Sequence, residues 1–144
     1  MRTRRSWSDK LLSSKPPEVK RLAHAFADMP EGCQMLIASP QLVDEYLRRI
    51  PAGTTRTTKT LRDDLAAALH AEHTCPLTTG IFLRIAAEAA WEQHQAGSPL
   101  AKVAPFWRAI DPDSTLAKKI TCGPEFIRRQ RAKEAQSKLP ASSA

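Results

Sequence analysis

The chain has 144 residues, 42% hydrophobic and 26% charged, a balance typical of one folded domain rather than of a disordered chain. No apolar run approaches the ~20 residues of a bilayer-spanning helix, and the basic first segment lacks the apolar stretch of a secretory signal. Lysine and arginine number 22 against 15 acidic residues, and the resulting charge of +7 favours an anionic partner, of which nucleic acid is the commonest. Three widely spaced cysteines, Cys33, Cys75 and Cys122, do not form a disulfide framework, so we expect a reducing cytoplasm.

Composition divides the chain into three parts. Residues 1–17 are predicted to be a basic N-terminal arm, anchored by Trp7 and the Leu11–Leu12 pair. Residues 18–133 are expected to be the folded domain, and residues 134–144 a flexible tail because they lack apolar periodicity. The arm takes its charge from Arg2, Arg4, Arg5, Lys10 and Lys15.

Start and stop signals place the elements of the folded part. Ser39 followed by Pro40 is a strong helix start, because serine caps a helix and proline fits its first position. The expected elements are a short helix over 19–28, a strand over 35–38, a helix over 40–50, a helix begun at Thr57 or Thr58, a long helix from Thr78 or Thr79 to Gly97, a strand over 106–110, a turn over 111–114 and a last helix introduced by Gly123 and Pro124. This order predicts a mainly α fold, a winged helix-turn-helix with a short β hairpin.

Two segments have the chemistry of a nucleic-acid contact. The stretch Thr54–Thr60 combines five threonines with Arg56 and Lys59 before a helix, and hydroxyls, exposed amides and cations suit phosphate oxygens. A helix cap in a polar loop explains the same stretch equally well. The stretch 76–80 opens the long helix, where a helix-turn-helix approaches a groove, and Gly80 permits close backbone approach. An ordinary interior helix is the alternative there.

Metal and nucleophile chemistry have weaker support. His70, His73 and Cys75 are too few for a tetrahedral zinc site with no second Cys/His pair nearby, so no metal is expected. Cys75 with His73 two residues away is a weak signal for a nucleophile, because small buried cysteines are common. No phosphate loop, Ser-His-Asp arrangement or dinucleotide fingerprint occurs, and we expect no cofactor.

Three short motifs, in order, carry a resemblance to a known family. They are the segment IPAGTTRTT over 50–58, similar to IPxGxxxSY; the segment TGIF over 79–82, at the start of a recognition helix; and the segment PFWRA over 105–109, similar to the alkyl-acceptor motif PCHRV. With these the chain resembles the DNA-binding domain of alkylguanine-DNA alkyltransferases and, more closely, the alkyltransferase-like proteins that lack the acceptor cysteine. The resemblance runs from Pro40 to about residue 131.

The departures from the family pattern decide the expected chemistry. Phe106 stands at the position of the acceptor cysteine and Trp107 at that of its histidine, and neither side chain can accept an alkyl group or act as the base. Thr58 replaces the family's tyrosine, and Leu77 stands near its base-displacing arginine, where it could act as an apolar wedge. The resemblance therefore implies binding of alkylated, flipped bases, which are handed to excision repair, without alkyl transfer.

We accordingly expect a non-catalytic protein that recognises alkylated or modified bases in double-stranded DNA for repair, as a cytoplasmic, nucleoid-associated monomer with excision-repair proteins as partners. The alternatives are an enzyme that uses Cys75 for alkyl transfer or base modification, and a structural or regulatory binder that reads duplex shape. The alternative role of Phe106 and Trp107, which we call the aromatic pair, is packing in the core. The expected DNA contacts are Arg56, Thr57, Thr58 and Lys59 on the backbone and Leu77, Thr78, Thr79 and Gly80 at a groove. Phe106 and Trp107 are expected to form the wall of a base pocket, and Arg108 is expected to contact DNA and support this pocket.

Overall fold

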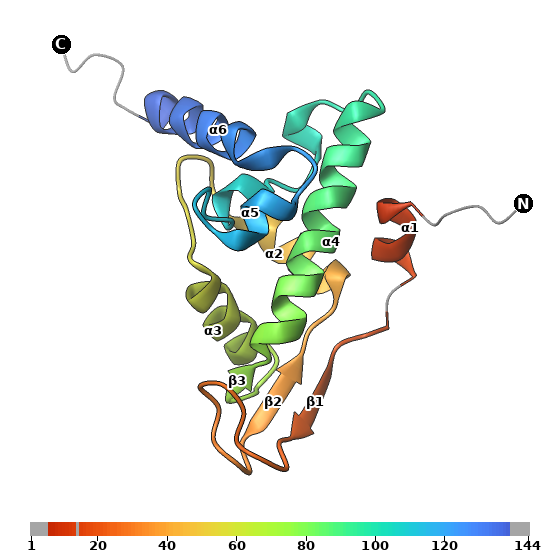
Figure 1. Ribbon diagram of the computed structural model, residues 1–144, viewed down its shortest axis with the longest axis vertical. Helices are drawn as coiled ribbons and strands as arrows, with labels where there is room; N and C mark the ends of the chain where they lie inside the picture. The colour runs from red at the N-terminus through yellow and green to blue at the C-terminus, as the bar shows by residue number, and fades with distance from the viewer. Residues whose placement is uncertain (1–5, 14, 139–144) are drawn as a thin grey trace, which may run out of the picture.

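A computed structural model describes residues 6–13 and 15–138. These residues are mainly helical, with a small three-stranded sheet, and none of their helices is long and apolar enough to cross a bilayer. The long helix α4 follows the long axis, with the sheet at one end and α6 across the other (Figure 1). The elements are α1 (Trp7–Leu12), β1 (Glu18–Arg21), β2 (Gln34–Ile37), α2 (Pro40–Arg49), α3 (Thr58–Ala68), β3 (His73–Thr74), α4 (Pro76–Gln95), the 3-10 helices η1 (Leu100–Lys102) and η2 (Phe106–Arg108), α5 (Thr115–Lys119) and α6 (Gly123–Lys138).

Hydroxyl side chains begin the helices at the predicted places. Ser39 Oγ accepts the Leu42 N–H at 3.1 Å, with Pro40 as the first residue of α2. Thr57 caps α3 in the same way, which decides between the two threonines expected there. The bounds of the elements confirm four further predictions to within a residue or two: the 35–38 strand, the 40–50 helix, the 111–114 turn and the last helix. α4 begins at Pro76, earlier than predicted.

The main core lies between α4 and the elements that surround it. The inward face of α4 carries alanines, Ala86, Ala87 and Ala90, whose small side chains let α2 approach closely. Phe106 stacks on Phe126 of α6, with ring centroids 5.9 Å apart. The core therefore joins α4 to the C-terminal third of the chain.

The hairpin is formed by different residues from those predicted. β1 pairs antiparallel with β2, with Glu18 opposite Ile37, and β3 adds a short parallel edge to β2. The predicted 19–28 helix is wrong, although Leu22, Ala25 and Phe26 have helical spacing. Residues 18–21 pair with β2, the Leu22 N–H donates to the Cys33 carbonyl, and Phe26 forms a bridge with Met29, so these partners satisfy the backbone groups instead.

The predicted strand over 106–110 is also wrong, because Phe106–Arg108 forms a 3-10 helix. Both Phe106 and Trp107 are buried, and adjacent residues of a strand would point to opposite faces. A tight helical turn after Pro105 directs both aromatic rings into one core.

The two ends of the described chain are more ordered than the sequence indicates. Within the predicted arm, residues 7–12 form α1, which packs on α4 with Leu11 buried and Leu12 exposed. The arm residues 1–5 lie outside the described part. Within the predicted tail, α6 continues to Lys138, so the folded domain extends past residue 133; residues 139–144 lie outside the description.

Candidate nucleic-acid interface

The loop before α3 is held in place by its backbone. The N–H of Arg56 donates to the Arg108 carbonyl at 2.7 Å, and that of Thr54 to the Pro51 carbonyl at 3.1 Å. Gly53 has a φ of +83°, a conformation that favours glycine at this turn. The loop therefore has a fixed path, and it brings Arg56 and the first turn of α3 to one surface.

A hollow of about 350 Å³ opens at this surface. Arg131 of α6 contributes a cation held only by carbonyls within the described residues: its Nε donates to Trp107 at 2.7 Å and its Nη2 to Ile110 at 2.9 Å. Burial lowers the pKa of Arg131, and Asp111 partly opposes this effect. The hollow thus contains hydroxyls, cations and one carboxylate. Its lining residues are Thr55, Arg56, Thr57, Thr58, Ala109, Asp111, Ser114 and Arg131.

A second concave surface, which we call the α4 groove, lies between the first half of α4 and α5. Leu77 and Ile81 leave 63% and 50% of their surface exposed, although both are large apolar residues. A Cβ atom at Gly80 would meet no neighbouring atom within 4 Å, so the backbone here is open to a ligand. The groove is lined by Leu77, Gly80, Ile81, Arg84, Thr115, Leu116 and Lys119.

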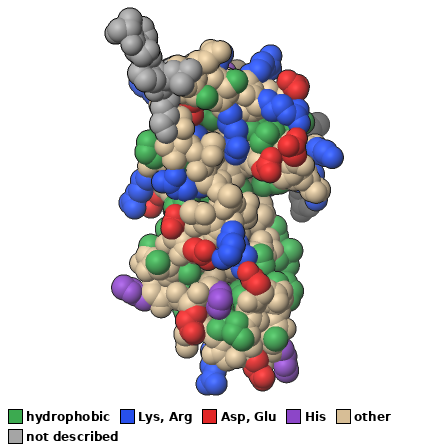
Figure 2. Space-filling view, turned by 90° about the vertical axis from the view of Figure 1, so that its left-hand side faces the viewer, with side chains coloured by type: hydrophobic (Ala, Val, Ile, Leu, Met, Phe, Trp, Pro, Cys, Tyr) green, Lys and Arg blue, Asp and Glu red, His purple; other side chains and the backbone are tan. Residues whose placement is uncertain are grey.

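The start of α5 joins the hollow to the α4 groove. Ser114 lines the hollow and the next residue, Thr115, lines the groove. The structure therefore brings together the two segments that the sequence singled out, the loop before α3 and the first turns of α4. Figure 2 shows the face on which α3 lies, where Lys and Arg side chains gather in the upper half and are few toward the sheet.

The residues expected at the interface fall into two groups, those buried or engaged within the protein and those exposed at the surface. Thr79 is fully buried, and its hydroxyl donates to the Cys75 carbonyl at 2.6 Å, so it faces the core and not a groove. Thr78 Oγ1 is buried without a hydrogen-bond partner among the described residues. Thr57 and Thr58 are both exposed, but the Thr57 hydroxyl is occupied as the N-cap of α3. Lys59 is exposed and pairs with Asp63 at 3.1 Å.

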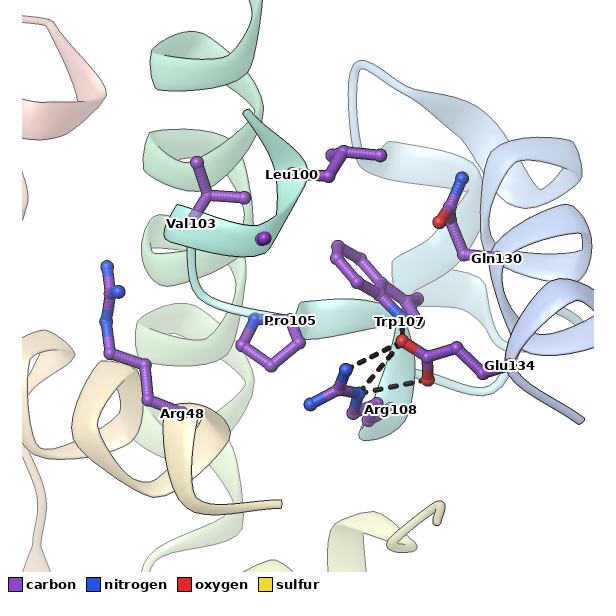
Figure 3. A pocket seen from close by; sticks show the side chains of 9 residues that line it. Arg48, Leu100, Val103, Pro105, Trp107, Arg108, Gln130 and Glu134 are labelled. Atoms are coloured by element: carbon purple, nitrogen blue, oxygen red, sulfur yellow. Dashed lines mark hydrogen bonds and ion pairs between the residues drawn. The ribbon is translucent and has the colours of Figure 1, made fainter. Parts of the chain in front are cut away.

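Arg108 belongs to a clamp rather than to a nucleic-acid contact. Glu134 of α6 accepts hydrogen bonds from Arg108 Nη2 at 2.7 Å and from Trp107 Nε1 at 2.9 Å (Figure 3). It also accepts the Gly53 N–H at 3.3 Å. Arg108 Nη1 also donates to the Ile50 carbonyl at 2.6 Å. Burial alone would raise the pKa of Glu134, but these hydrogen bonds outweigh it, and the pKa lies below its usual value. The clamp fixes the loop that carries Arg56.

Of the two aromatic residues expected to form the wall of a base pocket, only Trp107 borders a hollow. Phe106 is fully buried and lies against Trp107 and Phe126, which is the core-packing alternative. Trp107 and Arg108 both line a hollow of about 370 Å³ beside Gln130, but the Trp107 indole N–H and the Arg108 guanidinium are already bonded to Glu134.

The cysteine alternative loses support in the fold. Cys75 is buried in a small apolar cluster with Met29, Cys33 and Met35, which gives a base or a bound duplex no access to its thiol. Within residues 6–13 and 15–138, no group of three His, Cys, Asp or Glu side chains is placed to hold a metal ion.

Sequence reasoning missed much of this surface, including Ile81, Arg84, Asp111, Lys119 and Arg131. Ile81 and Arg84 follow Leu77 at helical intervals, and this periodicity on an otherwise buried helix could have identified them. Asp111 and Arg131 reach the hollow only because η2 and α6 fold back on the loop before α3, and nothing local in the sequence signals that. Comparison of the chain with models of protein families, with curated proteins and with solved structures gives no match.

Proposed function

We propose that this chain is a non-catalytic DNA-binding protein that recognises modified bases in duplex DNA. The observation that carries the proposal is the single surface on which the loop before α3, the start of α5 and the α4 groove meet. On this surface α3 and α4 act as a helix-turn-helix pair, with α4 as the element that approaches the groove of the duplex.

The charges of the surface support a phosphate-rich partner. Arg56 lies at the N-terminus of α3, whose free amide groups suit phosphate oxygens, and Lys119 and Arg84 flank the α4 groove. The chain as a whole carries +7. Exposed Leu77 and Ile81 between these cations suit apolar contact with bases or sugars once the backbone is engaged.

We assign the base pocket, which was expected at Phe106 and Trp107, to the hollow at the N-terminus of α3. It opens beside the α4 groove, and it presents a carboxylate acceptor on Asp111 and the exposed hydroxyl of Thr58. The Ser114 hydroxyl is already used, because it donates to the Asp111 carbonyl at 2.6 Å and accepts the Ala117 N–H at 3.2 Å. Enzymes and sensors that act on one base read its hydrogen-bonding edge after it leaves the stack. We propose that an extrahelical base binds in this hollow, and that the protein recognises damaged bases for repair through this binding. Binding alone is the activity, because Phe106 and Trp107 supply neither nucleophile nor base.

The backbone contacts are tested by fluorescence anisotropy with a labelled duplex over a range of salt concentrations. Each phosphate contact contributes a slope of about −0.9 in log K against log salt, so the double variant Arg56→Ala, Lys59→Ala flattens the slope by one to two units. Lys20→Ala, which removes an exposed cation of β1, is the control and leaves the slope unchanged. Equal slopes in all three proteins would contradict the proposed interface.

Base recognition is tested with duplexes that are intact, mismatched or contain an alkylated guanine. We expect the alkylated duplex to bind more tightly, and Asp111→Asn to remove that preference while intact duplex binds as before. Asp113→Asn, an exposed neighbour outside the hollow, is the control. Equal affinity for all three duplexes would favour the shape-reading alternative. A gain of one alkyl group in the intact mass, abolished by Cys75→Ser, would favour the enzyme.

A further inference from the structure

Helix α1 is attached to α4 by its N-terminus. The carboxylate of Glu92 in α4 accepts the N–H of Trp7 at 3.2 Å and that of Ser8 at 3.1 Å. Burial alone would raise the pKa of Glu92, but these hydrogen bonds outweigh it and the pKa lies below its usual value. Leu11 is buried. A helix of six residues is not stable by itself in water, so α1 depends on these contacts with α4.

The docked helix places two cations beside one aromatic ring. Lys10 Nζ lies 4.2 Å from the centroid of Trp7, and Arg84 Cζ lies 5.4 Å from it, so the indole attracts both charges. Arg84 belongs to two concave surfaces at once. It lines the α4 groove, and it also lines a hollow of about 520 Å³ between α1 and α4, together with Trp7 and Lys10. The cation pair is therefore continuous with the proposed interface.

The acidic side chains of this second hollow are already occupied. Glu88 is almost completely buried and accepts the Thr121 N–H at 3.2 Å, while Glu92 caps α1. Arg84 lies 3.7 Å from Glu88, beyond hydrogen-bond distance, and its side chain remains 40% exposed. Arg84 is thus not locked into a hydrogen-bonded ion pair as Arg108 is by Glu134.

We propose that Lys10 and Arg84, brought together by Trp7, bind a backbone phosphate of duplex DNA beside the α4 groove. This inference rests on the proposed function and extends its interface to α1. Two cations converging beside an open groove are suited to a phosphodiester, and such a contact fixes the orientation of a protein on the duplex without reading its sequence. Glu92 is a positioning residue in this arrangement, because it holds the helix on which Lys10 lies.

The test repeats the salt titration with Lys10→Ala and with Lys10→Gln, which keeps a long polar side chain on α1. Both variants flatten the slope by about 0.9, the amount for one phosphate contact, whereas Lys20→Ala does not. Glu92→Gln lowers duplex affinity in the same direction because it loosens α1. The double variant Lys10→Ala, Glu92→Gln loses less than the sum of the single losses, since both changes act through one contact.

The outcomes separate this inference from the proposed function. If the wild-type chain binds duplex with a slope that depends on Arg56 but not on Lys10, the α1 contact is refuted and the proposed function stands. If the wild-type chain shows no salt-dependent binding to any duplex, the proposed function fails. Strictly additive losses in Lys10→Ala and Glu92→Gln would refute the positioning role of Glu92.

Discussion

Replacing Glu134 with glutamine tests the clamp that holds the loop before α3. The side chains of Arg108 and Glu134 are 15% and 17% exposed, so their ion pair is mostly shielded from water. The variant keeps the shape of residue 134 but removes the negative charge of its carboxylate. That carboxylate accepts hydrogen bonds from Arg108, Trp107 and Gly53. Breaking one side of a buried pair costs about 3–5 kcal/mol, and we expect the lower limit because the amide oxygen still accepts one bond.

Thermal unfolding followed by circular dichroism measures this loss. In a chain of this size each kcal/mol lowers the melting temperature by about 2–4 °C, so Glu134→Gln should lower it by about 6–12 °C. Glu125→Gln on the same helix is the matched control: its carboxylate is 73% exposed and pairs with Arg128 on the surface. That variant should cost no more than about 1 kcal/mol. Equal losses in the two variants would refute the clamp.

The same variant has a definite pH dependence. The folded-state pKa of Glu134 lies below the unfolded value, so its contribution to stability is fully present above the unfolded pKa. That contribution is lost as the pH falls through the folded-state pKa, where Glu134 becomes protonated. The difference in melting temperature between wild type and Glu134→Gln should therefore shrink toward zero in acid. A difference that stays constant down to strongly acidic pH would contradict this assignment.

Three further predictions concern single side chains. Phe106→Ala removes a fully buried ring and should cost about 3–5 kcal/mol in denaturant unfolding, whereas Leu12→Ala, at an exposed position, should cost almost nothing. Burial and a hydrogen bond to Asp64 raise the pKa of Tyr46, the single tyrosine, so its ultraviolet titration should begin at higher pH than that of a free phenol, and Asp64→Asn should move it down. Burial, with Glu88 nearby, raises the pKa of Cys122 to about 11, so its alkylation at mildly alkaline pH should be slower than that of a free thiol.

The sequence predicts the parts of the fold that depend on local chemistry. The starts of α2 and α3 follow from Ser39 and Thr57, because a hydroxyl caps a helix whatever the rest of the chain does. The segment 106–110 has the composition of a strand, but consecutive burial of two aromatic rings selects a tight turn instead. That burial depends on α6, far along the chain, and no local pattern encodes it.

The residues of the candidate site also divide into those that local sequence predicts and those that depend on distant parts of the chain. Arg56 and the exposed Leu77 could be predicted, since charge and position at a helix start are visible in the sequence. Thr79 could not, because rotation of α4 about its axis decides which residues of the first turn face the core. Arg108 was expected to contact DNA, and only the return of Glu134 from α6 shows that its charge is already paired.

The clamp also makes the proposed interface depend on the outer turns of α6. Glu134 lies in the outer turns of α6, where Ala132, Lys133, Ala135 and Gln136 are exposed, so the clamp itself is the main contact that opposes local unfolding there. Such an opening releases Gly53 and Arg108 while the core around Phe106 stays intact. Under the proposed function, the closing equilibrium of these turns would set the population of molecules able to bind a duplex, and duplex binding would in turn protect the amides of α6 from hydrogen exchange.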